Sequence, residues 1–76
     1  MSNEVKKNKT YCTLYIYAKL HDEGSITKDE IKKELGLTDL RFMRYLQEIR
    51  AYLCNFSTAK ELVYNRKEDR YYIQDI

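Results

Sequence analysis

The fold of this chain is decided by residues 26–53, which read ITKDEIKKELGLTDLRFMRYLQEIRAYL. Thr27 and Glu30 have the spacing of a capping box, in which each side chain accepts a hydrogen bond from the other residue's backbone N–H. A helix therefore begins after Thr27, and its few apolar residues recur four apart on one face. Gly36 follows that face, where helices often end on a residue with positive φ. This half of the stretch predicts a short amphipathic helix and a tight turn.

A second, longer helix follows the turn, with Thr38 or Asp39 as its cap. Its apolar positions recur at i, i+4, i+7 and i+11 and share one inward face: Phe42, Leu46, Ile49 and Leu53. At about 100° per residue, the outward face carries Leu40, Arg41, Arg44, Gln47, Glu48 and Ala51. Its flanks carry Met43 and Arg50 on one side and Tyr45 and Tyr52 on the other. Two helices joined by a short turn are the sequence form of a helix-turn-helix.

The residues after this pair of helices predict a β-hairpin. Residues 61–64 and 70–73 are rich in β-branched and aromatic types, and they flank the polar segment 65–69, NRKED. Residues 25–26 can add a very short strand to the same sheet. A hairpin directly after a helix-turn-helix is the wing of a winged helix, so these strands disfavour the alternative of an ordinary helical hairpin in a small bundle. Phe56, in the link between helix and hairpin, is expected to close the core.

Residues 11–21, YCTLYIYAKLH, are apolar almost all round and could pass as a strand. We expect a helix, because four residues fit one face and a further helix is needed to close the core. These four are Leu14, Tyr17, Ala18 and His21. With Leu14, Ala18 and Leu20 inward, the residues left outside are Tyr11, Tyr15 and Ile16. Such an aromatic cluster suggests contact with a second copy of the chain, or a cover formed by the arm or by the last three residues.

Length and composition predict a small globular protein. A chain of 76 residues is one domain at most, and we expect a flexible arm over residues 1–10 and the folded domain over residues 11–76. Hydrophobic residues make up 43% of the chain against 34% charged ones, which is typical of a globular protein. No apolar run approaches the roughly 20 residues that span a bilayer, and no signal-peptide pattern opens the chain. We therefore expect a cytoplasmic protein with no membrane contact.

Metal binding and catalysis find little support in the sequence. Cys12, Cys54 and the single histidine, His21, do not have the paired spacing of a zinc site. Both cysteines are expected to pack as small apolar groups. No nucleophile, base and acid are arranged for catalysis, and no glycine-rich phosphate loop is present. The sequence thus predicts a binding protein that is not an enzyme and has no metal, cofactor or evident small-molecule ligand.

The runs GLTDLRFMRYLQEIRAYL and ELVYNRKEDRYYI resemble the N-terminal DNA-binding module of DeoR-type and WYL-domain bacterial regulators. The resemblance covers about residues 14–74. It departs from the family's pattern at Leu40 and Arg41, where arginine and threonine are common, at Tyr45, where aspartate is common, and at Arg70, which replaces a glycine. The resemblance implies a mostly α, α+β fold: a three-helix winged helix-turn-helix with a C-terminal two-stranded wing. We expect this module to stand alone, because 76 residues leave no room for an effector domain.

Charge is unevenly distributed along the chain. Residues 41–70 hold seven basic residues against four acidic ones, whereas residues 20–39 hold six acidic residues against three lysines. The basic part is the longer helix with the hairpin, where a winged helix meets duplex DNA. The net charge is only +2, so one copy would bind a half-site weakly and a homodimer is expected.

We expect Arg41 and Arg44 to enter the major groove and pair with guanine, and Gln47 to read adenine. The remaining expected DNA contacts are to the phosphate backbone or minor groove, and they involve Thr38, Lys28, Arg66 and Lys67. Each of these charges is also consistent with a solvated side chain, an alternative nearly as strong as DNA contact for the two wing residues.

A second hypothesis assigns the same face to a protein partner. Apolar and aromatic side chains ringed by charge are typical of protein hot spots, and here they are Leu40, Met43 and Tyr45, with Tyr11 and Tyr15 on the first helix. Such a module would be an adaptor or antagonist of a larger machine, for example one encoded by a mobile element. A third hypothesis, an architectural protein that bends DNA, shares the fold.

Overall fold

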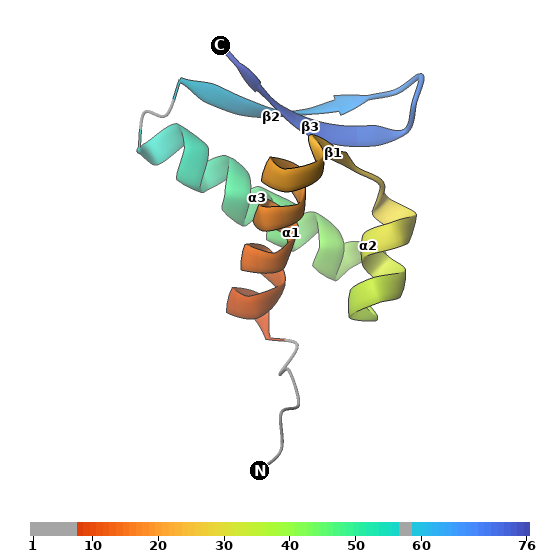
Figure 1. The fold of residues 1–76 in the computed structure, drawn as a ribbon. Coiled ribbons are helices and arrows are strands. Elements are labelled where there is room, and N and C mark those ends of the chain that lie inside the picture. The colour runs from red at the N-terminus through yellow and green to blue at the C-terminus, as the bar shows by residue number, and fades with distance from the viewer. Residues whose placement is uncertain (1–7, 57–58) are drawn as a thin grey trace.

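The computed structural model describes residues 8–56 and 59–76, which form three helices and a three-stranded sheet (Figure 1). The elements in chain order are α1 (Lys9–Glu23), β1 (Ser25–Ile26), α2 (Lys28–Leu35), α3 (Asp39–Asn55), β2 (Lys60–Asn65) and β3 (Arg70–Asp75). The predicted α+β, mostly α fold with winged helix-turn-helix topology is confirmed. Of the expected arm over residues 1–10, residues 1–7 lie outside the described part of the chain, whereas Asn8 caps α1 and residues 9–10 belong to that helix.

The sheet is antiparallel in the order β1-β3-β2, so β3 is the central strand. Tyr72 of β3 pairs with Ser25 on one side and with Val63 on the other. A side-chain hydrogen bond also joins β3 to β1, in which Arg70 Nε donates to Ser25 Oγ at 2.8 Å. The sheet lies across one end of the helices (Figure 1) and is held to the loop between α1 and α2 by β1.

Local signals form the helix-turn-helix as predicted. The capping box is present, with Thr27 N donating to Glu30 Oε2 at 2.8 Å and Glu30 N donating to Thr27 Oγ1 at 3.2 Å. Gly36 ends α2 with a φ of 65°, in the left-handed region that glycine adopts at little cost. The buried Leu37 follows, and Thr38 caps α3 by accepting a hydrogen bond from Arg41 N at 3.2 Å.

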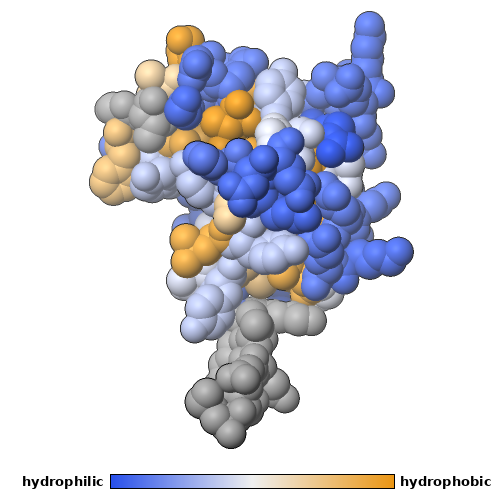
Figure 2. All heavy atoms as spheres, in the orientation of Figure 1, coloured by the Kyte–Doolittle hydropathy of each residue, from blue (hydrophilic) through white to orange (hydrophobic). Residues whose placement is uncertain are grey.

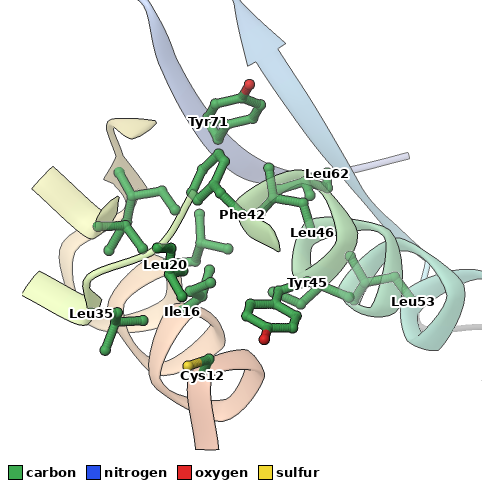
Figure 3. Close-up of a cluster of buried hydrophobic side chains, with 14 residues drawn as sticks. Cys12, Ile16, Leu20, Leu35, Phe42, Tyr45, Leu46, Leu53, Leu62 and Tyr71 are labelled. Atoms are coloured by element: carbon green, nitrogen blue, oxygen red, sulfur yellow. The ribbon is translucent and has the colours of Figure 1, made fainter. Parts of the chain in front are cut away.

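The core lies between the inner faces of the helices and the sheet (Figure 3). From α1 it receives Cys12, Ile16 and Leu20, which are at most 2% exposed. The expectation that Leu14 and Ala18 face the core is therefore wrong, since both are exposed. The sequence of α1 is apolar on several faces, and the four-residue spacing of Cys12, Ile16 and Leu20 matches the surface formed by the other elements.

Three further expectations about packing are wrong. Tyr45, expected on a flank of the outward face of α3, is only 5% exposed and belongs to the core. It lies on the side of α3 that packs against α1 (Figure 3), so the buried stripe of α3 is wider than its apolar residues alone indicate. Cys54 and Phe56 are exposed, because the carboxyl end of α3 extends beyond the core.

The burial of Tyr45 gives a direct test of this packing. Tyr45→Ala leaves an unfilled core position and should lower the free energy of unfolding by about 3 kcal/mol. Leu40→Ala on the same helix removes part of a side chain that is 69% exposed. This substitution should change the free energy of unfolding by less than about 0.5 kcal/mol. Urea unfolding followed by circular dichroism measures both, and equal losses would contradict the observed orientation of α3.

Candidate nucleic-acid interface

The outward face of α3 is the best-defined exposed surface of the helix-turn-helix. The inner face of α3 packs against α1, α2 and β2, and every residue predicted on the opposite side is exposed: Leu40, Arg41, Arg44, Gln47, Glu48 and Ala51. We call these six residues the α3 face. The sequence therefore located this surface correctly, because the buried positions of a two-sided helix fix the exposed ones.

Two exposed arginines lie in the amino-terminal half of the α3 face. The guanidinium groups of Arg41 and Arg44 make no hydrogen bond or ion pair within the described ranges, and both residues are exposed. A guanidinium presents five N–H donors in a planar fork that fits two acceptors at once, such as O6 and N7 of guanine. The two side chains are thus available to an external ligand without loss of an internal contact.

Gln47, predicted to read adenine, already makes one side-chain hydrogen bond within the chain. Its Oε1 accepts a hydrogen bond from Arg50 Nη1 at 2.9 Å. Bidentate reading of adenine uses both the oxygen and the nitrogen of the amide. The oxygen has two lone pairs, so the bond from Arg50 leaves it one further acceptor position, and the amide NH₂ can donate.

The start of α3, where a phosphate contact was predicted, holds a carboxylate. Asp39, in the first turn of the helix, pairs with Lys28, whose Nζ lies 3.7 Å from Oδ2, and more closely with Lys32. We call these three residues the Asp39 clasp. Thr38, also expected to hold a phosphate, uses its hydroxyl oxygen to cap the helix. The negative charge of Asp39 stabilises the positive end of the α3 dipole. The same carboxylate occupies the position that an incoming phosphate would take.

The clasp also affects ionisation. A hydrogen bond from Lys32, and then the charge of Lys28, lower the pKa of the Asp39 carboxyl from its ordinary value. This pKa is lower in the folded chain than in the unfolded one. The clasp therefore stabilises the fold at pH values above the pKa that Asp39 has in the unfolded chain. That contribution is lost as the pH falls through the folded pKa.

The wing tip brings together both predicted wing residues and two acids. Arg66 and Lys67 are exposed in the turn between β2 and β3, next to Glu68 and Asp69. Tyr64 Oη donates to Asp69 Oδ1 at 2.5 Å, and this hydrogen bond raises the pKa of Tyr64. Asp69 thereby becomes fixed beside the strand, while the two basic side chains extend into solvent.

The residues predicted to contact a protein partner separate into three groups. Leu40, Tyr11 and Met43 are exposed by 69%, 52% and 38%, whereas Tyr45 belongs to the core and not to any surface. Tyr15 is 39% exposed, but its hydroxyl donates to Glu34 Oε1 at 2.6 Å, which also lowers the pKa of that carboxyl. Tyr15 therefore links α1 to α2.

Sequence reasoning missed the Asp39 clasp and the Tyr64–Asp69 bond. Lys28 and Lys32 are four residues apart on α2, which was a signal that both could reach one acid. Nothing in the sequence alone, however, places the start of α3 against that side of α2. The Tyr64–Asp69 contact spans the hairpin turn and depends on its conformation.

Other kinds of site are absent from the residues described. No group of three or more His, Cys, Asp and Glu residues in these ranges could hold a metal ion. In the same ranges, no helix has the length and apolarity that crossing a bilayer requires. Comparisons with protein-family models, with curated proteins and with solved structures find no match for this chain.

The Asp39 clasp predicts a specific titration. The Asp39 carboxyl carbon, followed by NMR, should titrate below the ordinary aspartate value of about 3.9. Lys32→Met should move its pKa back toward that value, because the first cause of the shift is removed. Lys33→Met, on the same helix and outside the clasp, is the matched control and should leave it unchanged. An ordinary pKa in the unmodified protein would contradict the clasp.

Proposed function

We propose that the protein binds duplex DNA through α3 and the wing and acts as a small transcriptional regulator. The observation that carries this proposal is the pair Arg41 and Arg44, which are exposed on the outward face of the second helix of a helix-turn-helix and whose guanidinium groups have no partner among the described residues. That helix is the one that enters the major groove in DNA-binding proteins of this topology. A guanidinium fork held there is suited to guanine.

In this mode the two parts of the interface have different tasks. Arg44, supported by Arg41, reads base edges, and Leu40 can pack against a thymine methyl group. Arg66 and Lys67 at the wing tip contact phosphates, which position the protein and carry no sequence information. The net charge of +2 makes the non-specific attraction to DNA small, so affinity depends on these few side chains.

The Asp39 clasp gives this surface an internal competitor. A DNA phosphate near the start of α3 would be repelled by Asp39, whose carboxylate also pairs with Lys28 and Lys32 and offsets one of their two positive charges. The clasp thus lowers affinity for any duplex irrespective of sequence, and it raises the share of binding energy that comes from base contacts.

The exposure of Leu40 favours one alternative. An apolar side chain that is 69% exposed in the α3 face, with Met43 beside it, is also what a protein hot spot requires. In that case binding would depend little on salt and would be lost with Leu40→Asp, while Arg44→Ala would have little effect.

DNA binding is tested by fluorescence anisotropy with an operator selected from random duplexes. Arg44→Ala should weaken binding roughly 5- to 100-fold, since a bidentate base contact is lost, and should relax specificity at one position. Lys60→Ala removes the same charge at the opposite end of β2 from the wing tip and is the control. Absence of salt-sensitive binding to any duplex by the unmodified protein would overturn the proposal.

The clasp predicts a variant that binds more tightly. Asp39→Asn should raise affinity severalfold and steepen the dependence of log K on log salt, because two lysines become available to phosphates. Asp75→Asn releases Lys60 from a comparable pair away from the interface and should have no such effect. Unchanged or weaker binding by Asp39→Asn would show that the clasp does not oppose DNA.

A further inference from the structure

Leu40 is the apolar member of the amino-terminal half of the α3 face. It is 69% exposed and directly follows Asp39, which pairs with two lysines of α2. Figure 2 shows hydrophilic residues over α2 and over the wing tip. Met43, three residues further along α3, is tied to the wing, because its sulfur accepts a hydrogen bond from Tyr71 Oη at 3.8 Å. Leu40 therefore projects from the start of α3 as an apolar side chain among polar and charged groups.

Leu40 and Arg44 are neighbours on this face. Four residues turn an α-helix through about 400°, so the two side chains project within about 40° of each other and lie about 6 Å apart along the axis. Stacked bases lie about 3.4 Å apart. A helix in the major groove that sets Arg44 against a guanine therefore brings Leu40 to a base within about two base pairs of that guanine.

The base edges in the major groove offer a leucine few favourable contacts. Hydrogen-bond donors and acceptors make up most of each edge, and the apolar group among them is the C5-methyl of thymine. A leucine set against a donor or acceptor removes water from it without replacing the hydrogen bond, which costs free energy. Uracil and cytosine carry only hydrogen at C5 and leave more of the leucine in water. Leu40 is thus suited to a pyrimidine that carries a 5-methyl group.

We propose that the protein distinguishes pyrimidines by their 5-methyl group, and that its preferred site holds thymine or 5-methylcytosine within about two base pairs of the guanine contacted by Arg44. The inference rests on the proposed DNA binding and adds a second determinant of specificity to it. The methyl group packs on Leu40, while the guanidinium of Arg44 pairs with O6 and N7 of the guanine. Methylation of a cytosine at that position therefore strengthens binding.

Replacing single thymines of the selected operator by uracil tests the methyl contact, because the two bases differ only in that group. Fluorescence anisotropy should show that one replacement weakens binding about fourfold. It should lie within about two base pairs of the guanine whose preference is lost in Arg44→Ala, and a more distant position would overturn the proposed geometry. At the same position, 5-methylcytosine should bind about fourfold more tightly than cytosine. Whichever of thymine and 5-methylcytosine binds more tightly is the preferred source of the methyl group.

The leucine side of the contact is tested with Leu40→Ala. This variant should lose the preference for thymine over uracil and keep the preference for guanine. Leu14→Ala shortens a leucine that is 61% exposed on α1, outside the α3 face, and should keep both preferences. DNA binding without a methyl effect, or a methyl effect that survives in Leu40→Ala, would overturn this inference and leave the proposed function standing. Absence of binding to every duplex would instead overturn both.

Discussion

The contact between Phe42 and Tyr71 joins the helix-turn-helix to the wing. Phe42 is fully buried on α3, and its ring meets that of Tyr71 on β3 edge to face, with centroids 5.5 Å apart. Tyr71 in turn lies 4.7 Å, centroid to centroid, from Tyr64, which holds Asp69 at the wing tip. This line of aromatic contacts therefore helps to set the position of the wing relative to α3, together with the buried Leu62 of β2. A surface that uses α3 and the wing together depends on the same line.

Those parts of the fold that are encoded over a few residues could be predicted from the sequence. The Thr27–Glu30 capping box, the turn at Gly36 and the Thr38 cap each need only local geometry, and all are present. The hairpin follows from two β-prone runs around a polar segment. The inward face of α1 could not be predicted in this way, because its helix is apolar on several sides. Tertiary packing selected Cys12, Ile16 and Leu20 from more than one suitable face.

The same distinction between local and long-range relations applies to the candidate site. Exposure of Arg41, Arg44 and Leu40 followed from the periodicity of α3, since a helix with one buried stripe must expose the other side. The burial of Tyr45 did not follow, because it depends on how closely α1 approaches α3. The pairing of Asp39 with two lysines of α2 depends on the angle that the turn gives to the helices. These long-range relations decide which charges on this surface are available.

The pairing of β1 with β3 bears on the order in which the chain folds. Arg70 and Ser25, which bond across these strands, are 45 residues apart, whereas α2 and α3, and likewise β2 and β3, are consecutive elements of the chain. Closing so long a loop costs chain entropy that local contacts do not. The pair of α2 and α3 and the hairpin of β2 and β3 can thus form from local contacts, whereas β1 cannot exist as a strand until β3 lies beside it. Long-range closure therefore completes the sheet, and the packing of the hairpin on α3 sets Tyr71 against the ring of Phe42.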